Sequence, residues 1–181
     1  KGTTVTVKKA LDEMIIHSDN TATNLMIDRL GMDRVNRYLK EHGYKDTTLR
    51  RKMMDLSREK GAENMTTVRD VGLLFKRLYQ GKCVSKDLDA QMLAIYKAQV
   101  DTDMLPDKLP KGTVVAHKTG EVRDLRHDGG IVYTAKRRLC PRLYLRGIIR
   151  RMRSVADFVA PGFYDWVCEV SFLLSPKIGR I

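Results

Sequence analysis

Apolar residues in the first hundred positions recur at the spacing of amphipathic helices. Counting from Val7, positions i, i+3, i+4, i+7 and i+8 are apolar, which predicts a helix that buries one face. The same spacing predicts four further helices, over about 18–30, 33–42, 66–81 and 85–96.

Residues suited to helix ends stand where these patterns begin and stop. A Ser or Thr before a helix accepts a hydrogen bond from a free backbone N–H, and a glycine commonly follows the last turn. The expected first residues are Ser18, Thr66 or Thr67, and Ser85, and the expected stops are Gly31, Gly43 and Gly81. Residues 45–64 are polar and contain glycine, which predicts a long connection.

The hydrophobic period changes to that of strands after Pro106 and Pro110. The expected elements are a strand at 114–118, a turn at 121–129, a strand at 130–134, a weak strand around 143–145 and a final helix near 155–167 that Pro161-Gly162 interrupts.

This order of elements predicts an α+β fold with a helical lobe and an antiparallel sheet. We place the helical lobe at residues 1–108 and a partial α/β lobe at 109–181, with its tail doubtful. The chain is 43% hydrophobic and long enough to bury a core. It has no run of 18 apolar residues, so we expect no membrane span.

The net charge of +12 raises the possibility of a nucleic-acid partner. Eight basic residues and no acidic one lie between Lys136 and Arg153, so the excess is confined to one segment. A non-enzymatic protein that binds an anionic surface through this segment stays an alternative, but we expect no nucleic-acid binding. The cysteines, Cys83, Cys140 and Cys168, are widely spaced, and we expect unreactive thiols.

Two tripeptides carry candidate chemistry. Ser18-Asp19-Asn20 lies between two predicted helices, and Lys118-Thr119-Gly120 ends a predicted strand. Alone, each has a structural explanation, because Ser and Asp cap helices and glycine serves strand-end geometry. Together, in this order and with helices between them, they match two of the three motifs of penicillin-recognising serine enzymes.

Further segments extend this resemblance. They are Ser18 to Leu25, Arg51 to Asp55, Glu63 to Thr67, His117 to Gly120 and His127 to Gly130. The chain from about Gly2 to Thr134 resembles the class A β-lactamase family, and most of all its branch of β-lactamase-like serine hydrolases. The resemblance implies an incomplete β-lactamase/transpeptidase-like fold and a small-molecule β-lactam as substrate.

The family's chemistry is acyl transfer, in which a serine attacks the β-lactam carbonyl and water releases the acyl group. By this resemblance, the catalytic residues of our chain are Ser18 and Lys118. Ser18 would relay a proton to the leaving nitrogen, and Lys118 would place a positive charge beside it. The substrate-binding residues would be Asn20, Thr119, Gly120 and Glu121. The family implies no metal and no cofactor, and we expect a monomer.

The family's nucleophile motif, Ser-x-x-Lys, is absent upstream of Ser18. Ser57-Arg58-Glu59-Lys60 matches as a string, but it lies downstream and among charged residues, so we reject it. We therefore expect an N-terminally truncated, nearly inactive chain. In its intact form the protein would be periplasmic or secreted.

The deacylating glutamate also departs from the family pattern. The usual Glu-x-x-x-Asn spacing ending at Asn64 puts Lys60 where the glutamate belongs, while Glu59 and Glu63 are off register. A role for either in activating water stays open, and so does a penicillin-binding peptidase or transpeptidase relative. The four histidines lack ligand spacing, and we expect structural hydrogen bonds from them. After Thr134 the Arg-rich composition suggests an altered end.

Overall fold

The computed structural model describes residues 2, 4–55, 63–107, 109–122, 125–133 and 142–149. For Val122, Leu125 and residues 142–149 it describes the backbone alone. The elements are α1 (Val7–Ile16), α2 (Asn20–Leu30), α3 (Met32–Glu41), α4 (Val68–Gln80), α5 (Lys86–Lys97), β1 (Val114–Val122), β2 (Leu125–Tyr133) and β3 (Arg142–Ile149).

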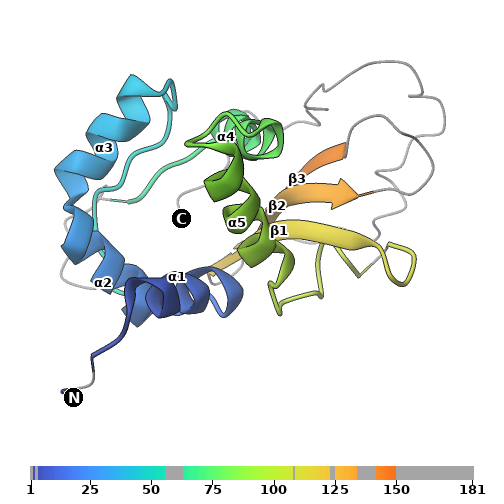
Figure 1. Ribbon diagram of the computed structural model, residues 1–181, viewed down its shortest axis with the longest axis horizontal. Coiled ribbons are helices and arrows are strands. Elements are labelled where there is room, and N and C mark those ends of the chain that lie inside the picture. The colour runs from blue at the N-terminus through green and yellow to red at the C-terminus, as the bar shows by residue number, and fades with distance from the viewer. Residues whose placement is uncertain are drawn as a thin grey trace.

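The helices lie to one side of a single sheet (Figure 1). Helices α4 and α5 stand between α1, α2, α3 and the strands, with α5 against β1 and α4 against β2 and β3. Helix α1 contacts both α2 and α5. The α+β fold with a helical part and an antiparallel sheet is the one expected from the sequence.

The helix ends follow the chemistry of their capping residues. Thr67 and Ser85 are the N-caps of α4 and α5, and each side chain accepts a backbone hydrogen bond. Gly81 ends α4 in the left-handed conformation that favours glycine. Gly31, also at positive φ, separates α2 from α3. These predicted boundaries are confirmed to within about one residue.

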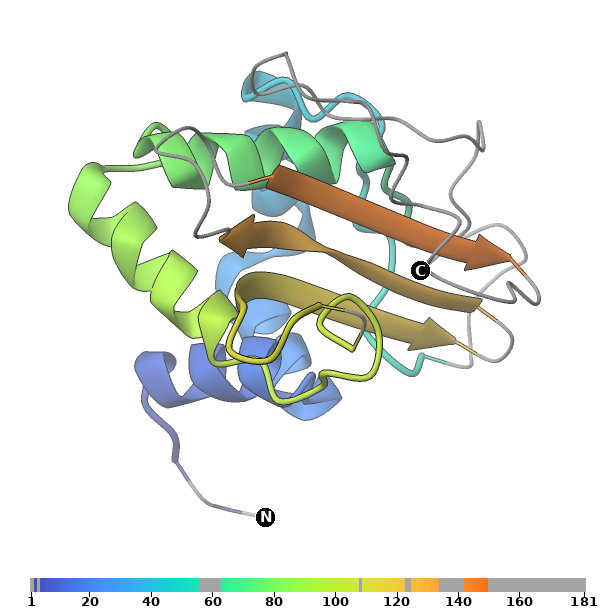
Figure 2. The same ribbon diagram turned by 90° about the vertical axis from the view of Figure 1, so that its right-hand side faces the viewer.

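The described strands are antiparallel in the order β1-β2-β3, so β1 has β2 as its one neighbour among them (Figure 2). The predicted turn at 121–129 is wrong, because Glu121 pairs with Arg126 and Gly120 with His127 inside the β1–β2 ladder. These paired positions are polar or glycine, so the sequence lacks the apolar alternation that identifies a strand. The weak third strand is confirmed, and β3 is longer than expected.

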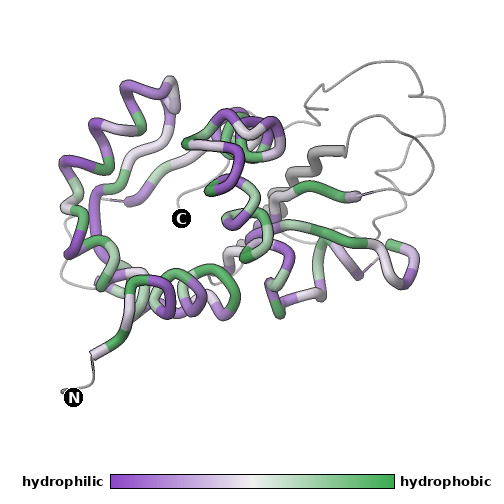
Figure 3. The backbone as a smooth tube through the Cα atoms, viewed as in Figure 1, coloured by the Kyte–Doolittle hydropathy of each residue, from purple (hydrophilic) through white to green (hydrophobic). Residues whose placement is uncertain are grey.

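The hydrophobic core lies where α4 and α5 cover the sheet. Its buried members are Phe75, Leu78, Leu93, Ala116 and Ile131. Figure 3 shows apolar stretches of the strands beside α5. Packing of the apolar helix faces against one sheet face therefore excludes water from the centre of the molecule.

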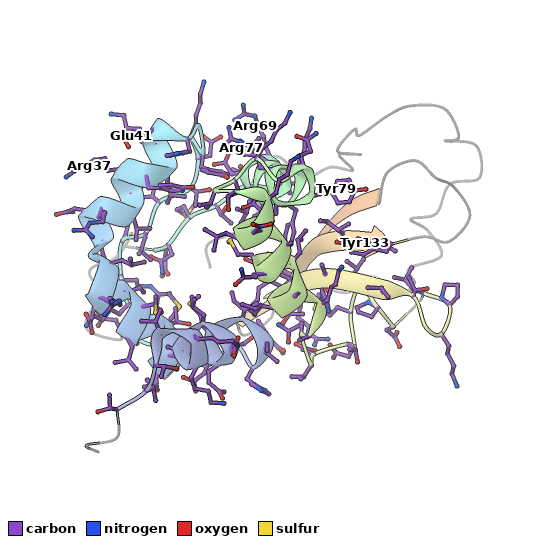
Figure 4. All side chains as sticks on the ribbon, in the orientation of Figure 1. Arg37, Glu41, Arg69, Arg77, Tyr79 and Tyr133 are labelled. Atoms are coloured by element: carbon purple, nitrogen blue, oxygen red, sulfur yellow. The ribbon has the colours of Figure 1, made fainter. Side chains whose placement is uncertain are left out.

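Aromatic rings extend the packing to the edge of this core. The rings of Phe75 and Tyr96 meet edge to face, with centroids 5.0 Å apart. Tyr79 of α4 and Tyr133 of β2 lie close together (Figure 4), with ring centroids 6.5 Å apart. The ammonium of Lys97 lies 4.3 Å from the centre of the Tyr133 ring, where the ring quadrupole attracts it.

The long connection between α3 and α4 is held by polar side chains. Three asparagines each donate to a backbone carbonyl and accept from a backbone N–H; the pairs are Asn24 with Met53, Asn36 with Leu49, and Asn64 with Arg50 and Arg51. Asp70 is almost fully buried and accepts from the Asp46 N–H and the Thr47 hydroxyl. The described parts of the connection, 42–55 and 63–67, are therefore held in place despite their polar sequence.

Some expectations concern residues outside those described. The helix near 155–167, Cys140, Cys168 and the side chains of the basic segment 136–153 belong to this group. Cys83 is a free thiol. Among the helices of the described residues, none has the length and apolar character needed to cross a membrane.

Gly130 gives a direct test of the sheet's packing. A Cβ at Gly130 would overlap the Ala116 carbonyl oxygen and lie 2.5 Å from the Cβ of His117. We expect Gly130→Ala to lower the free energy of unfolding by about 1–3 kcal/mol through overpacking. Gly120→Ala is the matched control, because a Cβ at Gly120 meets nothing within 4 Å. Urea unfolding measures both, and equal stabilities would contradict this packing.

Candidate active site

Ser18 occupies a strained position between α1 and α2. Its φ is +55°, a value that costs a residue with a side chain free energy relative to the usual regions. The turn is fixed because the Glu13 carbonyl accepts from both the His17 N–H, at 3.2 Å, and the Asp19 N–H, at 3.1 Å. The exposed Ser18 side chain is therefore presented by the end of α1.

The predicted capping role of Ser18 is wrong. Asp19 is the N-cap of α2, and its Oδ1 accepts from the Ala22 N–H at 2.6 Å. An ionised Asp at a helix start interacts well with the positive end of the helix dipole. Because Asp19 supplies the cap, the Ser18 hydroxyl is available for a contact elsewhere.

That contact is with Lys118, one hundred residues further along the chain. The Lys118 Nζ donates to the Ser18 Oγ, and also to the Thr119 carbonyl at 2.6 Å. Lys118 is in the middle of β1, on the sheet face that α4 and α5 cover. The two tripeptides identified in the sequence are therefore joined directly.

Lys118 is half-buried, and burial lowers the pKa of its ammonium below the ordinary value. The carboxylates of Asp101 and Asp128 oppose this shift and raise the pKa of Lys118. An ammonium that donates to a hydroxyl oxygen leaves the hydroxyl proton free to be given to another group. The pair can thus hold an anion and pass on a proton.

A buried, hydrogen-bonded pair of polar side chains lies on the opposite face of the same strand. Within the pair, His117 Nδ1 is 2.9 Å from Asp128 Oδ1, and both side chains are almost completely buried. Asp128 Oδ2 also accepts from the Leu105 N–H at 2.9 Å. These contacts join β1 to β2 and to the segment before β1.

Only some of the histidines make the structural hydrogen bonds predicted from the sequence. Hydrogen bonds confirm it for His117 and for His42, whose Nδ1 lies 2.8 Å from the Tyr38 carbonyl oxygen. The prediction is wrong for His127, whose buried ring nitrogens have no partner, and whose pKa is lowered by burial. Within the described residues, the exposed His17 side chain makes no hydrogen bond.

The predicted substrate-binding residues lie near the Ser18–Lys118 contact along the chain. Asn20 is the exposed first residue of α2, and Thr119, Gly120 and Glu121 follow Lys118 in β1. Strand alternation puts the Thr119 side chain on the face opposite to Lys118, paired with Asp128. No hydrogen bond within the described part of the chain joins the Asn20 or Thr119 side chain to Ser18 or Lys118.

The candidates for water activation also have defined places. Glu63 Oε2 accepts from Arg51 Nε at 3.1 Å and Nη2 at 2.9 Å, in a largely buried pair. Both bonds go to one carboxylate oxygen, so the guanidinium pairs with the charge of Glu63 and fixes its orientation. Ser57, Glu59 and Lys60 lie outside the described residues.

Three residues of this region were not predicted from the sequence. They are Gln99, Asp101 and Asp128, whose charge raises the pKa of Lys118. Gln99 and Asp101 belong to no motif and lie in an irregular segment, so no sequence signal could have selected them. Asp128 stands beside His127 in a segment already noted, but its pairing with His117 needed the strand register.

Comparison with known proteins identifies the family of this chain. The Beta-lactamase enzyme family matches residues 1–141. The extended-spectrum β-lactamase PER-1 of Pseudomonas aeruginosa is 29% identical over 123 residues, which are 64% of this chain and 39% of that protein. The β-lactamase VEB-1 of the same organism is 25% identical over 125 residues, 66% of this chain and 42% of its own length.

Solved structures show the same fold. The β-lactamase of Sphaerobacter thermophilus is 31% identical with a TM-score of 0.69, over 75% of this chain and 52% of that one. PBP-A is 32% identical with a TM-score of 0.67, over 74% and 49%. The chain belongs to the Beta-lactamase enzyme family, and it spans about two fifths of the length of the curated relatives.

Stability measurements can test whether α2 is capped by Asp19 and not by Ser18. We expect Asp19→Ala to lower the free energy of unfolding by about 1 kcal/mol, because the Ala22 N–H loses its acceptor. In a Lys118→Gln background, which removes the bond that the Ser18 hydroxyl accepts from the ammonium, we expect Ser18→Ala to change it by less than about 0.5 kcal/mol, since the hydroxyl caps nothing. Chemical denaturation measures both, and a larger loss for Ser18→Ala would restore its capping role.

Proposed function

We propose that the protein acts on β-lactams through a serine acyl-enzyme, and that this chain supplies the part that binds the substrate and transfers the proton. The observation that carries the proposal is the hydrogen bond from the Lys118 ammonium to the Ser18 hydroxyl. It brings together a cation and a hydroxyl from the two segments that resemble the family motifs.

These two groups suit the chemistry of a β-lactam. Penicillins carry a carboxylate close to the ring nitrogen, so one cation can attract the carboxylate and stand beside the leaving group. We assign Ser18 to give its proton to the ring nitrogen as the amide bond breaks, which makes the amine a better leaving group. Lys118 would orient the hydroxyl and stabilise the negative charge that develops on it.

The remaining roles follow the family resemblance. Asn20 would hold the side-chain amide of the substrate. The resemblance gives the carboxylate to the Thr119 hydroxyl as well, but this buried side chain lies on the face of β1 opposite to Lys118, so we assign the carboxylate to Lys118. The backbone N–H of Glu121 would donate to the developing oxyanion, a contribution of about 2.7–4 kcal/mol per donor. Gly120 would keep the strand edge open, and a Cβ there meets no atom within 4 Å.

The attacking serine is assigned to no residue of this chain. No serine precedes Ser18 in the 181 residues, and Ser57 lies in a charged context downstream. We therefore propose that these 181 residues bind β-lactams without turning them over, because loss of the nucleophile costs about a millionfold in turnover in a comparable serine enzyme.

A penicillin-binding peptidase is the second candidate. The Arg51–Glu63 pair favours it, because a carboxylate held in an ion pair with a guanidinium is a poor base for activating water. A single-residue mutant of PBP-A, among the similar structures, has been solved as an acyl-enzyme complex with penicillin G. In a longer relative with its own nucleophile, fast turnover of a chromogenic cephalosporin would favour the β-lactamase, and a long-lived acyl-enzyme the peptidase.

Penicillin G binding to the 181-residue chain tests the proposed function. We expect penicillin G to shift the amide signals of Lys118, Thr119 and Glu121 in an NMR titration. Lys118→Gln should weaken binding tenfold or more, because a hydrogen bond to a charged group contributes about 1.5–3 kcal/mol. Lys111→Gln, at an exposed position before β1, is the matched control and should bind as the native chain does.

Two results would contradict the proposal. Equal weakening by Lys118→Gln and Lys111→Gln would show attraction by net charge alone, which salt screens. Rapid hydrolysis of a chromogenic cephalosporin by the purified chain would place the nucleophile within these 181 residues.

A further inference from the structure

A short segment is bonded both to the helix that presents Ser18 and to the sheet that presents Lys118. It comprises residues 99–105, and we name it the strap. It leaves the end of α5, passes the end of α1 and runs beside β1 and β2; Figure 2 shows the connection from α5 to β1 in front of the sheet. The strap belongs to no motif, yet it touches both elements that present the site.

The first end of the strap is bonded to α1. Gln99 is almost fully buried, and its Nε2 donates to the Ile15 carbonyl at 2.7 Å. The Val100 N–H donates to the Ile16 carbonyl at 3.3 Å. These two carbonyls belong to the last turn of α1, the turn from which Ser18 projects. A buried amide that satisfies a free helix-end carbonyl holds that helix end firmly.

The other end of the strap is bonded to the sheet beneath Lys118. The Leu105 N–H donates to Asp128 Oδ2, and the same carboxylate is bonded to His117, the residue before Lys118. Gly130 lies opposite His117 and leaves the space that this pair needs. Asp128 thus links the strap to the side chain of His117, the residue before Lys118 in β1.

The middle of the strap carries two carboxylates, those of Asp101 and Asp103. Asp103 Oδ2 accepts from Arg126 Nη2 at 2.6 Å, which ties the strap to β2 as well. Asp101 is half-buried and close enough to attract the Lys118 ammonium, and its N–H donates to Gln99 Oε1 at 3.0 Å. Gln99 therefore bonds both the end of α1 and the backbone of Asp101.

We propose that the strap fixes the Ser18 hydroxyl against the Lys118 ammonium, with Gln99 and Asp128 as positioning residues at its two ends. Ser18 and Lys118 come from different elements, and a single long side chain spans the distance between them. Such a contact persists only when both backbones are held by other bonds. The inference concerns the same site as the proposed function, but its test requires no β-lactam.

The response of the Lys118 side-chain NMR signal to Ser18→Ala tests this role. In the native chain, Ser18→Ala removes the acceptor and should shift the Nζ resonance. Gln99→Met removes the bonds to α1 and Asp101 at similar volume. In that background we expect Ser18→Ala to shift the Nζ resonance by less than about half of its shift in the native chain, because the two substitutions act on the same contact. Gln91→Met, on the exposed face of α5, is the matched control and should leave the shift unchanged.

Asp128→Asn tests the other end of the strap. It removes the charge and one acceptor from the network, and we expect the same loss of response. Asp33→Asn, at an exposed position in the first turn of α3, is the control. A full response to Ser18→Ala in both the Gln99→Met and the Asp128→Asn chains would overturn the proposal, even if both melt earlier, because the strap would then serve stability alone.

Hydrogen exchange of the unsubstituted chain gives a test that no folding defect can obscure. We expect the amides of Val100, Asp101 and Leu105 to exchange with similar protection, as parts of one cooperative unit. Unprotected amides at Val100 and Leu105 would refute a strap bonded at both ends. If the strap passes these tests and penicillin G fails to bind, the proposed function is wrong and the positioning of Ser18 still stands.

Discussion

The contact between the Ser18 hydroxyl and the Lys118 ammonium requires that the backbones on both sides of it are held in place. It joins a turn between two helices to the middle of β1, one hundred residues apart in sequence. A flexible lysine loses side-chain entropy when it is held in one place, and here it is also partly desolvated. The surrounding fold must offset both costs, and it does so by fixing the backbones from which the two groups project.

Each backbone is fixed by polar bonds to a different part of the molecule. The end of α1 is held by the buried amide of Gln99, and β1 is held by the His117–Asp128 pair on the face away from the helices. The apolar core lies on the other face, where Ala116 and Ile131 meet α4 and α5. The sheet thus has apolar packing on one side and a buried hydrogen-bond network on the other, and half-buried Lys118 projects from the apolar side.

Local physical chemistry made much of the fold predictable. Five helices followed from apolar spacing, and Thr67, Ser85 and Gly81 cap them as their side chains dictate. The strands were harder, because glycine and polar residues occupy the β1–β2 ladder where Gly120 pairs with His127. The cap of α2 was assigned one residue early, since Ser18 and Asp19 are both good caps and only the positive φ of Ser18 decides between them.

The sequence by itself determined the helices, the type of sheet and the two tripeptides, because spacing, capping and a short motif are properties of neighbouring residues. The tertiary structure alone decided that Lys118 bonds to Ser18, that Asp128 bonds to His117 and Leu105, and that Gln99 reaches Ile15. The reason is that strand register and the course of an irregular segment are set by burial and hydrogen bonding across the whole chain. No local pattern encodes which distant carbonyl a buried amide will meet.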